Sequence, residues 1–163
     1  MIERTFDAGF PNAVINHPSV HGWVRGACSG HLDLSSVVGD RQNFVLVGQY
    51  GFAVFVPRVP GIYELHAAVH PEGQGRWALA AAAAALEWMF VRADAWAVLA
   101  PVPANNAAAR QIVGALGFDL AQVLPDAWPS GDGAKVSLRI YTMLRKDWLP
   151  CQEARCLRRY WLA

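Results

Sequence analysis

Two residues that can accept a proton stand on one predicted strand. Glu64 and His66 lie two positions apart in the run Ile62 to Val69, and side chains two apart on a strand share a face. Either could take a proton from an amine, and imidazole suits this role because it titrates near neutral pH. We predict that one of the two is a general base. The alternative is a pair of hydrogen-bonded residues on a half-exposed sheet.

The stretch after this pair has the composition of a turn that leads into a helix. Val69 to Leu79 reads Val-His-Pro-Glu-Gly-Gln-Gly-Arg-Trp-Ala-Leu and runs into a series of alanines. The first four N–H groups of a helix have no acceptor within it, and the helix dipole adds partial positive charge there. We therefore predict a site for a phosphate-bearing cofactor. Its predicted contacts are Val69, Gln74, Gly75, Arg76, Trp77, Ala78 and Leu79.

A second helix is predicted to begin at Asn105 or Asn106 and to end near Leu116. Asparagine is a preferred N-cap, and Gly117 stands where glycine commonly ends a helix in a left-handed conformation. Asn106 could contact the cofactor or only cap the helix, and both roles are compatible. Arg110, one turn further on, is a candidate cofactor contact or an exposed arginine.

The elements that would carry these residues follow from the spacing of apolar residues. Strands are expected at 2–6, 44–47, 52–56, 62–69, 95–100, 118–124 and 135–144, helices at about 8–15, 18–24, 77–91 and 106–116, and loops at 26–40 and 125–134. The helix at 77–91 is apolar on so many sides that we expect it to be buried on several of them.

The order of these elements predicts the fold class. A strand, a helix and a strand between residues 62 and 100 form a βαβ unit with parallel strands, whereas the other strands follow one another as hairpins. We predict one α/β domain with a central mixed sheet flanked by helices. It would span 1–148, with 149–163 as a C-terminal tail or a short docked helix.

Composition narrows the functional classes. The 163 residues are 54% hydrophobic and 17% charged, with a formal net charge of +1, which suits a globular domain and gives no reason to expect a nucleic-acid partner. We expect a cytoplasmic protein without a membrane span, because no signal peptide is recognisable and the longest apolar run is too short. The three cysteines and the scattered histidines fit no metal-ligand pattern, so no metal is expected.

Two motifs in this order resemble the GNAT superfamily of acetyl-CoA-dependent N-acetyltransferases. The stretch from Val69 to Leu79 resembles the pyrophosphate loop of that family, with Gln74 at the position of its Gln or Arg. The stretch that begins Asn106-Ala-Ala-Ala-Arg and ends Leu116-Gly-Phe resembles the family's asparagine-led helix, and it follows about 30 residues later. The loop and the preceding Tyr-Glu-Leu-His strand are also similar to GNAT-like proteins encoded by bacteriophages and prophages.

The resemblance implies a fold and a mechanism. The parallel strands at 62–69 and 95–100 would splay apart in a mostly antiparallel sheet, and acetyl-CoA would pair with the open strand edge. Its pyrophosphate would lie on the N–H groups of 75–79. If Arg110 is a cofactor contact and not an exposed arginine, its partner would be the 3′-phosphate. A small-molecule or protein amine would attack the thioester directly, while an N–H of the 62–69 strand stabilises the oxyanion. A homodimer is compatible with this reading.

The sequence departs from the family pattern at three positions, one of which is Leu79 in place of the loop's final Gly or Ala. Trp77 stands where the loop normally has glycine, and Val113 stands where many members have a tyrosine that protonates the leaving thiolate. Water or another tyrosine, Tyr63 or Tyr141, could replace it. These departures leave two alternatives to an active acetyltransferase: a catalytically inactive binding or structural module on the same scaffold, and an acyl-CoA sensor that binds without transfer.

Overall fold

The computed structural model of the chain describes residues 2–24, 30–130 and 134–148. Its elements, in chain order, are β1 (Glu3–Arg4), α1 (Gly9–Ile15), α2 (Pro18–Val24), α3 (Ser35–Gly39), β2 (Phe44–Gly48), β3 (Gly51–Val59), β4 (Ile62–Val69), the 3₁₀ turn η1 (Pro71–Gly73), α4 (Arg76–Val91), β5 (Ala97–Pro103), α5 (Ala107–Leu116), β6 (Asp119–Pro129) and β7 (Lys135–Leu144). Among the described residues, no helix is both long and apolar enough to cross a membrane.

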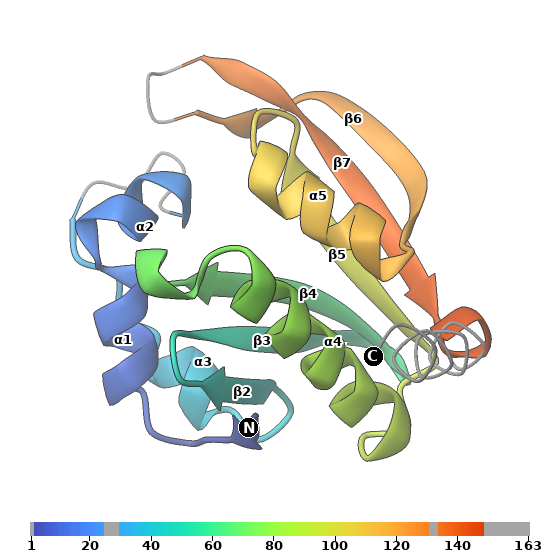
Figure 1. Cartoon of the computed structure of the whole chain (residues 1–163), viewed down its shortest axis with the longest axis horizontal. Coiled ribbons are helices and arrows are strands. Elements are labelled where there is room, and N and C mark those ends of the chain that lie inside the picture. The colour runs from blue at the N-terminus through green and yellow to red at the C-terminus, as the bar shows by residue number, and fades with distance from the viewer. Residues whose placement is uncertain (1, 25–29, 131–133, 149–163) are drawn as a thin grey trace, which may run out of the picture.

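The seven strands form one sheet in the order β1-β2-β3-β4-β5-β7-β6. Strands β4 and β5 pair in parallel, and every other described pair is antiparallel. The predicted α/β domain, with a mostly antiparallel central sheet, one parallel pair and flanking helices, is therefore confirmed (Figure 1). The predicted role of 149–163 stays a prediction, because that segment lies outside the described residues.

Apolar side chains form one cluster on each face of the sheet. The larger cluster joins α4 and α5 to the sheet and includes Phe55, Leu86 and Val98, while the smaller joins the N-terminal helices α1–α3 to β2–β4 and includes Val14 and Val38. Figure 1 shows α4 and α5 together in front of the sheet and α1–α3 gathered around β2–β4. The strands β2–β4 thus have helices on both faces. Over β5, β7 and β6, helix α5 covers one face.

Five expectations from the sequence need correction. The loop predicted at 26–40 contains α3, and β6 runs on to Pro129 through the loop predicted at 125–134. Strand β3 continues through Pro57 to Val59, with an irregular register there. Helix α4 buries one face, with Ala78, Ala85, Leu86, Met89 and Phe90, and leaves Val91 57% exposed. Many residues on its other sides are alanines, which are too small to require cover.

Strand β5 also runs further than predicted, through Pro101 to Pro103. Amide groups point alternately to the two neighbours of a strand. On β5 the N–H of Ala97 points to β4, where it donates to Gly61 O, and the N–H of Ala104 points to β7, where it donates to Ser137 O. Residues 99, 101 and 103 therefore face β4, so both prolines occupy positions that the ladder with β7 does not need.

Candidate functional site

The two parallel strands separate part-way along their length. Pairing between β4 and β5 ends at Glu64 and Leu99, although β4 continues to Val69 and β5 to Pro103. Figure 1 shows the two ribbons diverging beyond this point, with the start of α4 above β4. The divergence leaves two unpaired strand edges facing one another, as expected for a splayed parallel pair.

The two open edges differ in their hydrogen-bonding groups. On β4 the carbonyl of Gly61 faces β5 and the N–H of His70 faces β3, where it donates to Tyr50 O. Because the direction alternates, Ala67 and Val69 present both an N–H and a carbonyl to the open side. On β5 the corresponding positions are Pro101 and Pro103, which have carbonyls but no N–H. Donors along this gap therefore come from β4.

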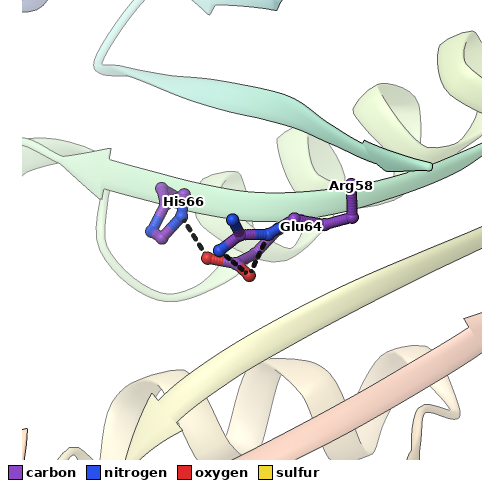
Figure 2. Close-up of polar contacts among 3 residues, drawn as sticks. All are labelled: Arg58, Glu64 and His66. Carbon is purple, nitrogen blue, oxygen red and sulfur yellow. Dashed lines mark hydrogen bonds and ion pairs between the residues drawn. The ribbon is translucent and has the colours of Figure 1, made fainter.

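Glu64 and His66 lie together on β4, as predicted. The Nε2 atom of His66 is 2.8 Å from Oε1 of Glu64, and Oε2 of the same carboxylate accepts from the guanidinium of Arg58, whose Nε is 2.7 Å away. Figure 2 shows Arg58 and His66 on either side of the carboxylate. Both oxygens of Glu64 are thus occupied.

The exposure of these side chains separates their roles. Glu64 is 18% exposed, whereas His66 is 53% exposed. A neutral imidazole that donates from Nε2 to a carboxylate carries its free lone pair on Nδ1. That atom points away from Glu64 in Figure 2 and has no hydrogen-bond partner among the described residues. Of the two side chains, His66 therefore offers the more accessible proton-acceptor atom, and its ring is held by the contact with Glu64.

Arg58 did not emerge from the sequence, although a signal for it existed. A short turn at 60–61 joins β3 to β4, so a hairpin places residue 58 close to residue 64. The register confirms the neighbourhood, since Val56 pairs with Glu64 and Val59 with Ile62 across the irregularity at Arg58. The strand predicted at 52–56 ends before Arg58, so this pairing was not expected.

The turn between β4 and α4 has the geometry expected of an anion site. Gly75 is the N-cap of α4 with φ 79° and ψ −123°, a conformation that glycine adopts far more readily than other residues. No side chain caps this helix. The N–H groups of Gly75, Arg76, Trp77 and Ala78 consequently have no acceptor within the helix. Leu79 differs, because its N–H donates to Gly75 O at 3.1 Å.

Other predicted cofactor contacts are side chains around this turn. Gln74 and Arg76 are exposed beside the free amides, and Val69 is partly buried at the end of β4. Next to them a narrow apolar crevice separates β4 from α4. It is lined in part by Leu65, Ala67, Val69, Trp77, Ala78 and Ala81. The small alanine side chains leave this space between helix and strand.

Trp77 points away from the free amides. Its ring meets the ring of Tyr50 edge-on, with 5.4 Å between centroids. A Cβ atom added at Gly48 or Gly73 would lie 3.0 Å or 2.9 Å from the Trp77 ring. The two glycines therefore make room for the indole against the β2–β3 turn. The large residue at this position does not obstruct the N-terminus of α4.

The second predicted motif, which begins at Asn106, forms helix α5 as expected. The side chain of Asn106 accepts a hydrogen bond from Ala109 N at 3.0 Å, and Gly117 ends α5 with φ 85°, so both predicted helix boundaries are confirmed. Arg110 is partly buried, and its Nε is a buried donor without a hydrogen-bond partner among the described residues. The contacts of Asn106 and Arg110 with a cofactor stay predictions.

Neither Tyr63 nor Tyr141, the two tyrosines predicted as substitutes for the one absent at Val113, lies on the face of His66. Val113 is 6% exposed in the core under α5. Tyr141 is a member of the same core cluster, and Tyr63 packs against it. Because Glu64 and His66 alternate with Tyr63, they lie on the opposite face of the sheet. No group of three or more potential metal ligands occurs among the described residues.

Comparison with solved structures shows a shared fold. Mutant forms of the spermidine/spermine N-acetyltransferase SpeG from Vibrio cholerae align with a TM-score of 0.76 at 14% identity, over 93% of this chain and 97% of that one. The yncA protein of Salmonella typhimurium, a candidate acetyltransferase solved with its cofactor acetyl-CoA, aligns at 0.75 and 19%, over 89% and 93%. A ribosomal-protein-alanine N-acetyltransferase from Brucella melitensis aligns at 0.74 and 20%, over 88% and 99%.

At these identities the comparisons establish the fold of the chain. No protein-family model and no curated protein matches the sequence. The structural similarity gives the chain the GNAT fold of these acetyltransferases, as the two sequence motifs predicted.

Proposed function

We propose that this chain is an N-acetyltransferase of the GNAT superfamily that transfers an acetyl group from acetyl-CoA to a primary amine. The observation that carries the proposal is the splayed β4–β5 pair, which brings three features to one place. They are the open edge of β4, the uncapped N-terminus of α4, and His66 held by Glu64. The fold shared with acetyltransferases, one of them solved with acetyl-CoA, supports the same assignment.

The residues around the splay fit the parts of acetyl-CoA. The free N–H groups of 75–78 suit a pyrophosphate, because backbone amides at a helix start bind anions. Exposed Gln74 and Arg76 add polar contacts beside them. The N–H and carbonyl groups of Ala67 and Val69 suit the amides of the pantetheine arm as an added strand. Bound acetyl-CoA would supply a thioester, an acyl group activated for transfer.

We assign the proton transfer to His66. Direct attack forms a bond between the amine nitrogen and the acetyl carbon, breaks the carbon–sulfur bond, and leaves one proton of the amine to be removed. Nδ1 of His66 is the free acceptor for that proton, and the hydrogen bond to Glu64 fixes the ring. The departing CoA thiolate then takes up a proton and becomes the CoA thiol. We assign the delivery of that proton to water, because Val113 stands where the family has a tyrosine. An open N–H of β4 stabilises the oxyanion.

Calorimetry with acetyl-CoA and with CoA, followed by a thiol-release assay with primary amines, tests the proposal. We expect saturable micromolar binding of both nucleotides and amine-dependent release of CoA. Absence of any binding would refute the assignment and support the inactive module. The similarity to phage-encoded proteins, a cytoplasmic location and a homodimer stay predictions.

The acyl-CoA sensor is the second candidate, and one observation favours it. Val113 is buried in the core, so the position of the family's proton donor holds a structural residue. Tight acetyl-CoA binding without CoA release to any amine would support the sensor. Turnover would exclude it.

A further inference from the structure

The face of β5 and β7 opposite α5 carries an apolar strip. Along β7, Tyr141 and Met143 belong to the core under α5, so the residues that alternate with them point to the other face. The register places Pro101 opposite Ile140 and Leu124 opposite Leu138 on that face. The strip consists of Leu99, Pro101, Leu124, Trp128, Leu138 and Ile140.

The strip belongs to neither core. All of its residues are partly exposed, and none is a member of either apolar cluster or packs against one. Core clusters normally gather the apolar residues of a domain, so a contiguous partly exposed set marks a surface that can bind something apolar.

The strip begins at the proposed base. Glu64 pairs with Leu99 in parallel register, so their side chains share a face, and His66 lies on that same face two residues further along β4. Beyond Leu99 the strands diverge, and Pro101 is the next strip residue across the gap. A molecule whose amine reaches His66 would therefore place the rest of its body on the strip.

The charges on this face do not suit a polycation. The charge of Glu64 is balanced by its ion pair with Arg58. Among the described strand residues that pair in register, Asp119 is the carboxylate added to this face, at its far edge beside Thr142. Arg139 points to the face of α5, because it pairs with core residue Val102. One base at the edge of an apolar surface matches a single amine on an apolar body.

We infer that the acceptor is a primary monoamine with an alkyl or arylalkyl body, seated with its amine at His66 and its body on the strip. This inference rests on the proposed function. It separates the chain from a polyamine acetyltransferase, whose substrate would need free carboxylates at intervals along the same surface.

The test compares amines at saturating acetyl-CoA: propylamine, butylamine, hexylamine, phenethylamine, spermidine and a peptide with an N-terminal alanine. We expect kcat/KM for CoA release to rise about fourfold per added methylene along the alkyl series, because each buried methylene contributes a constant transfer free energy. Spermidine and the peptide should be no better than propylamine.

A matched pair of variants locates the effect. Ile140→Thr makes the strip polar and should lower kcat/KM for hexylamine about threefold to tenfold, a larger loss than for propylamine, which covers less of the strip. Val123→Thr makes the same kind of change on β6, on the opposite face beside Arg139, and should change neither. A flat alkyl series, or a preference for spermidine or the peptide, would overturn the inference and leave the acetyltransferase standing. Failure to bind acetyl-CoA would overturn both.

Discussion

The two halves of the sheet are packed differently. Strands β2–β4 lie between α1–α3 on one face and α4 on the other, so both faces contribute to apolar clusters. Strands β5, β7 and β6 have α5 on one face and a partly exposed strip on the other. The helices differ in the same way, because the N-terminus of α5 is capped by Asn106 and that of α4 has no side-chain cap.

This difference shows how the fold divides its tasks. The doubly covered half holds the proposed base and its partners in place, because His66, Glu64 and Arg58 stand on strands fixed from both faces. The open half contributes surface instead, since side chains already buried in a core cannot also contact a ligand. The splay is where the two halves meet, and the candidate site lies there.

The strongest way to break this comparison is to remove the proposed base from the covered half. His66→Ala should lower kcat about 100- to 10,000-fold, the usual range for a positioned acid or base, and leave acetyl-CoA affinity unchanged. Glu64→Gln should cost only about tenfold, because an amide oxygen can still accept from Nε2. Steady-state kinetics and calorimetry measure both. Equal activity of His66→Ala and the parent would remove His66 from the mechanism.

Core packing should separate the halves almost as strongly. Phe55→Ala, at a side chain that is 0% exposed, should lower the free energy of unfolding by about 3–5 kcal/mol because it leaves a cavity. Ile140→Ala, on the strip, should cost roughly 1 kcal/mol. Urea unfolding gives both values. If Ile140→Ala were as costly as Phe55→Ala, the strip would be core and not binding surface.

Two glycines with positive φ provide a matched test of the helix ends. Gly75 and Gly117 have φ 79° and 85°, so alanine at either should cost roughly 1–2 kcal/mol of stability. Only Gly75→Ala should also weaken acetyl-CoA binding, about tenfold, because it shifts the free amides of α4. A similar loss of affinity in Gly117→Ala would show that the effect is general destabilisation.

The cap of α5 offers a smaller test. Asn106→Ala removes the acceptor for Ala109 N and should lower stability by about 1 kcal/mol. If the cap is its whole role, acetyl-CoA affinity measured by calorimetry should not change. A large loss of affinity alongside this modest loss of stability would instead assign Asn106 a contact with the cofactor.

The smallest expected effect concerns Asp33, which lies just before α3 on the β2–β4 half of the sheet. Hydrogen bonds from the Ser35 hydroxyl, the Ser35 amide and the Asn12 side chain hold the pKa of Asp33 below its usual value. A lowered folded-state pKa contributes stability above about pH 4, which is lost as the pH falls through that pKa. Thermal melts between pH 5 and pH 3 should therefore show a smaller loss of Tm in Asp33→Asn than in the parent. An equal loss would place the acid sensitivity elsewhere.

Much of the fold was predictable because its signals are local. Strand and helix periods placed the central elements, and Asn106 and Gly117 marked both ends of α5 correctly. The short helix α3 was missed, since its five residues, Ser35–Gly39, have the composition of a loop. The extension of β5 through its prolines was also missed. Local rules treat proline as a strand breaker, and only the divergence of β4 explains why no N–H is needed there.

The candidate site was predictable in its members but not in its arrangement. The residue types and spacing of 64–79 were enough to select Glu64, His66 and the anion-binding turn, because strand alternation and free helix amides are properties of the local chain. Tertiary structure decided the rest. It paired Arg58 with Glu64, left His66 accessible, turned Trp77 onto Tyr50, and left the strip beside His66 uncovered. These outcomes depend on which strands and helices meet across the sheet, and contacts between distant segments leave no local period in a sequence.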